Sequence, residues 1–213
     1  MNGVTVFEEN ADHYDRWYDE NESVYRAEIE ALRRFVPAEG RGIEVGAGTG
    51  RFSVPFHVRA GVEPAMGMAR IAKRRGVPVV RAMGERLPFC DGLFDFALLV
   101  AVVCFVESVP ELLDEVGRVL KPGGCIVIGF IDRDSPLGRH YESRRESSTF
   151  YRGIRFYTAG EIVSFLREAG FDECQTGQAV LGAPAGGEKR PIDDSPEASL
   201  SGFTVVSAVT CRR

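Results

Sequence analysis

The chain has 213 residues, of which 44% are hydrophobic and 27% charged, as is typical of one globular domain with a sizeable core. Its formal net charge of −5 argues against broad binding to nucleic acid or to an anionic membrane surface. No apolar run approaches the roughly 18 residues of a membrane span, and the first 20 residues lack the apolar centre of a signal peptide. With five cysteines lacking C-x-x-C spacing and three scattered histidines, we expect reduced thiols, no metal and a cytoplasmic location.

The first predicted element is helical and covers residues 6–35, where aromatic and apolar side chains recur at helical spacing until Pro37 and Gly40. Strands are then predicted at 41–46, 58–63, 78–82 and 94–100, with a helix after the second strand that runs to Arg75. The 94–100 segment is apolar at nearly every position, as expected of a central parallel strand that is buried on both faces.

The second half of the chain continues this alternation. An amphipathic helix is predicted at 112–120, closed by the Pro-Gly-Gly stop at 122–124, and a fifth strand follows at 125–131. A helix at 161–169 ends at Gly170, and strands at 171–181 and 203–211 flank a loop at 182–202 rich in Gly, Pro and Ser. This order predicts an α/β fold with a doubly wound, mostly parallel sheet, whose ligands bind beyond the carboxyl ends of the strands.

The most informative motif follows the first strand, where Glu44 precedes three alternating glycines, Gly46, Gly48 and Gly50. Glycine at every second position lets backbone N–H groups approach a ligand, whereas the acid would repel a bare phosphate. A dinucleotide fingerprint would need glycine at position 51, where the chain has Arg51, and the G-K-[ST] of a P-loop is absent. The loop favours a ligand that carries both an ammonium and a carboxylate, although a plain tight turn is compatible with the same residues.

A second acid ends the second predicted strand. Glu63 comes seventeen residues after Gly46, and an acid at such a position can accept hydrogen bonds from both hydroxyls of a ribose. A solvated loop carboxylate is the alternative interpretation. The end of an apolar strand beside the glycine loop favours the ribose contact.

Five short motifs follow one another within residues 41–131. They are EVGAGTG at 44–50, VEP at 62–64 with Met68, GERLPF at 84–89, FD at 94–95 and LKPGG at 120–124. Together they resemble the class I S-adenosylmethionine-dependent methyltransferases of the small bacterial methyltransferase-domain type, and YDRWY at 14–18 resembles a helix that often covers the cofactor there. The resemblance implies a Rossmann-like fold with a seven-stranded sheet whose last strand is antiparallel. Residues 1–40 would form a helical cap over the cofactor site, and 41–213 the methyltransferase domain, within a single structural domain.

The resemblance also implies a role for each matching residue toward S-adenosylmethionine, whose product is S-adenosylhomocysteine. The candidate cofactor-binding residues are Glu44, Gly46, Gly48, Gly50, Glu63, Met68, Gly84 and Glu85. The three glycines of the loop would pack around the methionine part, with Glu44 near its ammonium. Glu63 would hold the ribose. Met68 would lie against the adenine ring, and Gly84 and Glu85 at the adenine edge.

Three positions depart from the family pattern. Only residues 51–57 separate Gly50 from the second strand, so the first helix should be shorter than usual. Met83 stands where the family often has an acid for the adenine amino group, so Glu85 or backbone groups must serve instead. Cys104 stands where many relatives have histidine, so no acid–base residue carries over and no catalytic residue is assigned. We expect Cys104 to be a small buried apolar group rather than a nucleophile.

The segment 132–155 carries six arginines among four acids, a pattern typical of a solvated helix face. The alternative is a cover over the substrate pocket that favours an anionic group. His140, Tyr141 and Tyr151 also follow the fifth strand, where substrate contacts are plausible.

The interpretation that fits most motifs is an enzyme that transfers a methyl group to a small-molecule acceptor by in-line displacement. A noncatalytic S-adenosylmethionine-binding sensor or scaffold is the first alternative. An NAD-dependent oxidoreductase is disfavoured by Arg51, and a nucleic-acid methyltransferase by the acidic balance and the absence of an N/D-P-P-Y/F/W motif. The sequence leaves the acceptor, the methylated element and the oligomeric state open.

Overall fold

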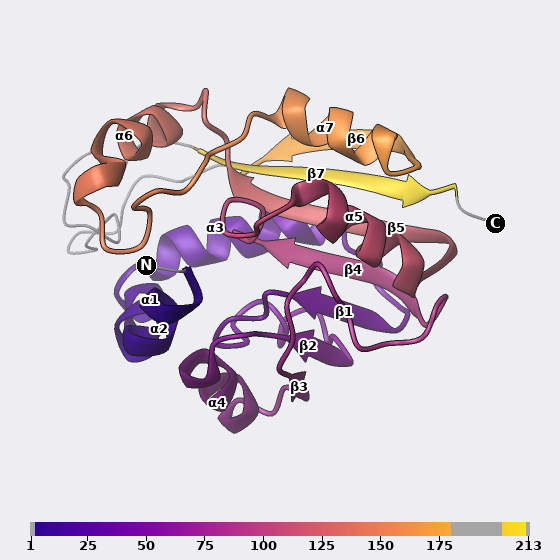
Figure 1. Ribbon diagram of the computed structural model, residues 1–213, viewed down its shortest axis with the longest axis horizontal. Coiled ribbons are helices and arrows are strands. Elements are labelled where there is room, and N and C mark those ends of the chain that lie inside the picture. Colours follow the sequence, from indigo (N-terminus) through magenta and orange to yellow (C-terminus); the bar gives the residue numbers. More distant parts are fainter. Residues whose placement is uncertain (1–2, 180–201, 212–213) are drawn as a thin grey trace.

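The computed structural model describes residues 3–179 and 202–211, and its centre is a seven-stranded sheet with helices on both faces (Figure 1). The strands are β1 Gly42–Val45, β2 Ala60–Val62, β3 Val79–Val80, β4 Phe94–Val100, β5 Leu120–Ile131, β6 Phe171–Gln178 and β7 Phe203–Thr210. Their spatial order is β3-β2-β1-β4-β5-β7-β6. Because β7 runs antiparallel to both β5 and β6 while the other pairs are parallel, the predicted sheet with an antiparallel last strand is confirmed. The predicted loop at 182–202 lies, except for Gly202, outside the described residues.

The N-terminal helical segment is divided into three. The helices of the described chain are α1 Gly3–Glu9, α2 Ala11–Glu20, α3 Glu22–Arg33, α4 Met66–Arg74, α5 Val109–Val119, α6 Pro136–Arg144 and α7 Ala159–Glu168, with the 3-10 turn η1 at Arg145–Ser147. The single helix predicted at 6–35 breaks at Asn10 and Asn21. Each asparagine donates its side-chain amide to the carbonyl four residues earlier, at 2.9 and 2.8 Å, and such bonds compete with the helix ladder.

Both ends of the α5 region differ from the prediction for local reasons. The helix begins three residues before the predicted 112–120 because the Ser108 hydroxyl caps the Glu111 N–H and Pro110 occupies the first turn. Strand β5 begins at Leu120, directly after the last residue of α5. Leu120 pairs with Phe94 of β4, and the next pair is Cys125 with Phe96. The Lys-Pro-Gly-Gly stretch at 121–124 therefore forms an irregular excursion within the strand rather than a separate stop.

The short helix expected at 51–57 is wrong, because these residues form consecutive turns. Pro55 has no N–H to donate and disfavours helical geometry at the residue before it. His57 adopts a left-handed φ of 50°, which ends any right-handed turn. The glycine loop therefore leads into compact turns.

The central strand β4 is buried on both faces, as predicted. Its Ala97 and Leu99 belong to an apolar cluster with α5 and α7, whereas Leu98 and Val100 belong to a second cluster with α3. The two clusters hold the sheet as the middle layer of a three-layer sandwich, with α5 and α7 in front of the sheet and α3 behind it in Figure 1. Within the described ranges, no helix has the length and apolar character needed to cross a bilayer.

Candidate functional site

A cavity opens at the carboxyl ends of β1 and β4, where a doubly wound sheet binds its ligands. It contains about 750 Å³ of atom-free space, part of which is open to solvent. Its lining comes from six parts of the chain and comprises Val4, Phe7, Tyr14, Val45, Gly46, Gly48, Glu63, Pro64, Met68, Ala82, Met83, Gly84, Glu85, Val100, Ala101, Val102, Phe105 and Val106. Six of the eight predicted site residues are in this lining; Glu44 and Gly50 are not.

The glycine loop presents bare backbone to the cavity. Gly46, Gly48 and Gly50 all have positive φ, at 71°, 53° and 81°. A Cβ at Gly46 would stand 2.2 Å from a methyl group of Val102, so only glycine fits between the loop and the turn after β4. A Cβ at Gly48 would meet nothing within 4 Å. Gly50 is outside the cavity lining, and a Cβ there would stand 2.9 Å from Val77 and 3.2 Å from Ala72 of α4. Gly46 thus allows the loop to approach Val102 closely, Gly48 leaves space open in the cavity, and Gly50 allows the loop to pack against α4.

Glu63 is held in place by the backbone. Its Oε2 accepts from the Gly48 N–H at 2.9 Å and its Oε1 from the Ala65 N–H at 2.8 Å, while the side chain is buried yet lines the cavity. Burial raises the pKa of Glu63, and the two backbone hydrogen bonds oppose the rise. Each oxygen has a remaining lone pair, so this carboxyl group can accept a vicinal pair of hydroxyls without reorientation.

Glu44 lies beneath the loop rather than in the cavity. Its side chain is 1% exposed and accepts a hydrogen bond from the Ser53 hydroxyl. Burial raises the pKa of Glu44 to about 8, with the Ser53 bond opposing the rise and the nearby Glu63 charge adding to it. Burial therefore favours the protonated form of Glu44. The predicted contact with an ammonium group stays a prediction.

The raised pKa of Glu44 makes folding stability depend on pH. An acid whose pKa rises from 4.5 to about 8 on folding contributes stability that is complete below pH 4.5 and is lost as pH rises toward 8. We expect Glu44→Gln, which stays neutral and can still accept from Ser53, to flatten the fall in unfolding free energy across this window. Urea denaturation at several pH values measures it; an unchanged slope would show that Glu44 is ionised in the folded protein. Burial also raises the pKa of Glu28 to about 8, so part of the pH dependence of the unfolding free energy should remain in Glu44→Gln.

A further part of the cavity lining comes from α4 and the loop after β3. Met68 is 2% exposed and lines the cavity from α4. Gly84 allows close approach, since a Cβ there would lie 2.7 Å from Leu112. Glu85 accepts from the Glu107 N–H at 2.8 Å through Oε1, whereas its buried Oε2 has no hydrogen-bond partner in the described structure. That oxygen is a free acceptor at the edge of the cavity.

Sequence reasoning missed two walls of the cavity. Phe7 and Tyr14 line it from α1 and α2, and Val102 and Phe105 line it from the turn after β4. The second wall was accessible in principle, because residues that follow a buried parallel strand lie at the ligand-binding edge of the sheet. The first depends on how the N-terminal helices pack, which periodicity does not show.

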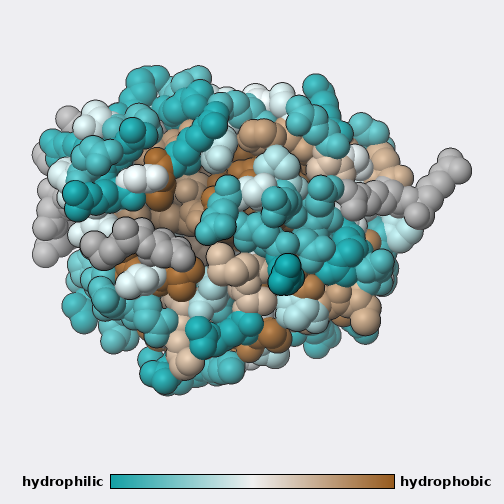
Figure 2. All heavy atoms as spheres, in the orientation of Figure 1, coloured by the Kyte–Doolittle hydropathy of each residue, from teal (hydrophilic) through white to brown (hydrophobic). Residues whose placement is uncertain are grey.

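A second, smaller cavity lies next to the first. It is lined by Ala101, Val103, Cys104, Phe130, Ile131, Tyr151, Phe156 and Tyr157, and Ala101 lines both cavities. Its walls are aromatic and aliphatic, with two tyrosine hydroxyls and one thiol as the polar groups. Burial raises the pKa of Cys104 to about 12, so this thiol stays protonated at neutral pH. Figure 2 shows apolar surface gathered in a hollow left of centre, bordered by hydrophilic side chains.

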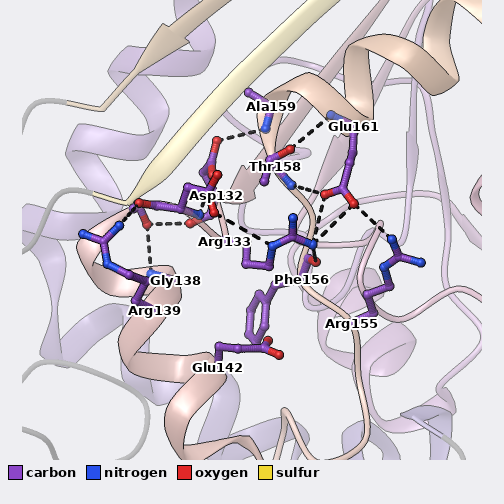
Figure 3. Close-up of polar contacts among 12 residues, drawn as sticks. Asp132, Arg133, Gly138, Arg139, Glu142, Arg155, Phe156, Thr158, Ala159 and Glu161 are labelled. Carbon is purple, nitrogen blue, oxygen red and sulfur yellow. Dashed lines mark hydrogen bonds and ion pairs between the residues drawn. The ribbon is translucent and has the colours of Figure 1, made fainter.

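Both ends of the charged segment 132–155 are held by polar contacts with the start of α7 (Figure 3). Asp132 accepts from the Ala159 N–H at 2.9 Å, and Glu161 completes the capping box of α7 with Thr158. Arg133 and Arg155 both contact Glu161, at 3.2 and 3.0 Å. These arginines pair with protein carboxylates, and among the described residues that line the two cavities none is basic. The preference for an anionic group stays a prediction.

The other substrate candidates of this segment divide between cavity and core. Tyr151 lines the second cavity. His140 and Tyr141 are buried, with ring centroids 5.9 Å apart, and line neither cavity. In the part of the chain described here, no group of three His, Cys, Asp or Glu side chains has the arrangement of a metal site.

Comparisons with known proteins agree on one family. A family model described as a methyltransferase domain matches residues 43–128. An uncharacterized protein of Methanocaldococcus jannaschii is 47% identical over 178 residues, which are 84% of this chain and 86% of that protein. The demethylmenaquinone methyltransferase of Streptomyces avermitilis is 32% identical over 136 residues, covering 59% of this chain and 58% of that enzyme.

A solved structure of clearly similar sequence also matches over nearly the full length. It is a SAM-dependent methyltransferase of Thermotoga maritima, described as a possible histamine N-methyltransferase. The two sequences are 37% identical, the match covers 97% of this chain and 99% of the other, and the TM-score is 0.84.

Proposed function

The chain belongs to the class I S-adenosylmethionine-dependent methyltransferases, and on this basis we propose that it methylates a small-molecule acceptor bound in the second cavity. The observation that carries the proposal is the position of Ala101. This residue directly follows β4, lines both cavities, and holds a φ of 55°, which is unusual for a residue other than glycine. An acceptor in the second cavity would therefore adjoin the contents of the first.

The residues of the first cavity fit the cofactor. Gly48 leaves open space where any other residue would place a side chain, the preformed carboxyl group of Glu63 suits a ribose diol, and Glu85 offers a buried oxygen without a partner among the described residues. When bound, S-adenosylmethionine supplies a methyl carbon that its sulfonium makes electrophilic.

Each predicted cofactor contact is part of the proposal. Gly46 and Gly48 would border the methionine part, and Met68, Gly84 and Glu85 the adenine. Gly50 would contribute indirectly, because its packing against α4 sets the path of the glycine loop. Glu44 would receive the ammonium through the loop, and binding of that charge would favour release of the Glu44 proton.

Among the described residues that line the second cavity, none could act as a strong base. Its described lining offers tyrosine hydroxyls and a protonated thiol, so catalysis would depend mainly on holding the acceptor in line with the methyl carbon. Positioning of this kind can supply about 7–11 kcal/mol. An acceptor atom that is already nucleophilic, such as a neutral nitrogen, needs no base and suits this environment best.

Two relatives support an acceptor of low molecular mass. The Thermotoga maritima protein is described as a possible histamine N-methyltransferase, and the Streptomyces avermitilis enzyme as acting on demethylmenaquinone. Histamine and demethylmenaquinone are both small molecules with a planar ring. The aromatic lining of the second cavity is the kind of surface that a planar ring packs against.

Filling the second cavity should stop methyl transfer without affecting cofactor binding. We expect Cys104→Phe to lower transfer of labelled methyl to a pool of small metabolites, histamine included, by at least about tenfold, because the added ring occupies acceptor space. Affinity for S-adenosylhomocysteine should stay within about twofold of the parent, since Cys104 does not line the first cavity. Cys90→Phe is the matched control, because Cys90 is an exposed cysteine outside both linings.

The same assay separates the competing functions. Label recovered only on protein or nucleic acid would contradict a small-molecule acceptor. Tight binding of S-adenosylhomocysteine with no transfer to any compound would favour the noncatalytic alternative. Binding of NAD in its place would favour the oxidoreductase.

A further inference from the structure

A single carboxylate joins three distant segments beside the cofactor cavity. Asp15 of α2 accepts from Arg51 Nε at 2.9 Å and from Arg51 Nη2 at 3.2 Å. It also accepts from Arg75 Nη1 at 3.1 Å and from Arg75 Nη2 at 3.0 Å. Two guanidinium groups therefore each grip the same carboxylate with two donors, the strongest geometry available to such pairs. The three side chains are mostly buried, with exposures of 17% for Asp15, 13% for Arg51 and 27% for Arg75.

Both arginines are tied to the glycine loop as well. Arg51 directly follows Gly50, and Arg75 Nη1 donates to the carbonyl of Thr49, between Gly48 and Gly50. The Arg51 carbonyl in turn accepts from the Tyr25 hydroxyl at 2.6 Å. We call Asp15, Arg51, Arg75 and the Thr49 carbonyl the Asp15 clamp. It links α2 directly to the backbone that borders the cavity at Gly48.

Helix α2, which the clamp holds, forms one wall of the cavity together with α1. Phe7 of α1 and Tyr14 of α2 are in its lining. α1 also lies tightly on α4, since a Cβ at Gly67 would stand 2.7 Å from the carbonyl oxygen of Glu8. Tyr14 precedes Asp15 in the sequence, so any shift of the clamp moves a residue of the cavity wall.

We propose that Asp15 is a positioning residue, whose clamp holds the α1–α2 wall closed against the glycine loop and sets the rate at which bound cofactor product leaves. The proposal goes beyond methyl transfer itself and rests only on the first cavity being the cofactor site. It also gives Arg51, which stands where a dinucleotide fingerprint has glycine, a role of its own in this fold.

Asp15 is the residue of the clamp whose negative charge both arginines share. Burial disfavours its charged form, but the hydrogen bonds from Arg51 and Arg75 outweigh burial and lower the pKa of Asp15 to about 2. Removing this charge would leave two guanidinium groups close together without a shared counterion, and breaking a buried pair in this way is far more costly than losing an exposed one. Asp19 offers the contrast: it contacts Arg51 at 2.7 Å, but its side chain is 65% exposed.

The single tryptophan of the chain, Trp17, lies in α2 two residues from Asp15 and reports on this helix. The test is stopped-flow Trp17 fluorescence as S-adenosylhomocysteine is displaced from the full-length protein by excess S-adenosylmethionine. We expect Asp15→Asn to speed dissociation of S-adenosylhomocysteine by at least about tenfold, and Asp19→Asn by less than about twofold. Asp15→Glu, which keeps the charge, should recover part of the slow dissociation.

Equal dissociation rates in the parent protein and Asp15→Asn would overturn the proposal, and so would equal effects of Asp15→Asn and Asp19→Asn. If Asp15→Asn fails to fold, Arg75→Gln takes its place, because it leaves Arg51 paired with both acids while removing the bond to Thr49. Asp95→Asn serves as a stability control, since Asp95 bonds Lys121 at the opposite end of the sheet. A parent protein that binds no S-adenosylhomocysteine would contradict the cofactor site itself, a result distinct from failure of the clamp.

Discussion

Glu63→Ala is expected to weaken binding of S-adenosylhomocysteine by at least about tenfold, which corresponds to about 1.4 kcal/mol or more. The proposed ribose contact is a pair of hydrogen bonds to a carboxyl group, and removing their acceptor leaves both hydroxyls to be satisfied by water alone. The variant also loses the bonds from the Gly48 and Ala65 N–H groups, so the loop that borders the cavity is less well fixed. Isothermal titration calorimetry measures the change.

A second substitution separates the direct contact from loop support. Glu63→Gln keeps an oxygen that can accept from one backbone N–H, but its amide nitrogen can no longer accept from the other. We expect its affinity to lie between those of the parent and Glu63→Ala. Asp95→Asn is the control for a carboxylate outside the cavity and should bind as the parent does. Parent-like affinity in Glu63→Ala would show that the ribose lies elsewhere.

Gly46→Ala is expected to lower the free energy of unfolding by about 2–5 kcal/mol, whereas Gly48→Ala should cost only about 1–2 kcal/mol. Both glycines have positive φ, so alanine at either position carries the penalty of left-handed backbone. Only at Gly46 does the new methyl group also collide with a neighbour, at 2.2 Å from Val102. The pair therefore isolates the effect of overpacking, and urea denaturation measures both.

For ligand binding, we expect the opposite order of effects from Gly46→Ala and Gly48→Ala. At Gly48 the methyl group would enter open space at the cavity wall, so Gly48→Ala should weaken S-adenosylhomocysteine binding more than its small stability loss implies. Equal losses of stability at the two positions would contradict the packing described for Gly46. Parent-like affinity in Gly48→Ala would place the ligand away from the loop.

Prediction from sequence was most accurate where local signals and tertiary packing agree. The 94–100 strand was predicted with the bounds that β4 has, because a short run that is apolar at nearly every position is typical of a parallel strand buried on both faces. The prediction failed where polar side chains act on the backbone: Asn10 and Asn21 divide one predicted helix into three, and Pro55 with His57 replaces a helix by turns. These signals were present in the sequence but compete with a helical periodicity that suggests continuity.

For the site, the sequence identified the residues that carry distinctive chemistry and missed those that provide shape. Glu63 and the glycines at 46 and 48 were found because an acid and bare backbone at strand ends have few other uses. Phe7 and Val102 were missed because an apolar side chain looks the same whether it fills a core or lines a cavity. The family resemblance implies that Gly50 contacts the cofactor, but this glycine is outside the cavity lining and lies against α4.

The sequence by itself determined the seven strands in chain order, the glycine loop and the family to which the chain belongs, since hydrophobic periodicity and short motifs are local properties. Only the tertiary structure decided that Glu44 lies buried beneath the loop with a raised pKa, that Ala101 separates two cavities, and that Asp15 meets Arg51 and Arg75. The physical reason is sequence separation: Asp15 and Arg75 lie 60 residues apart, and no local pattern encodes which side chains the packed sheet brings together.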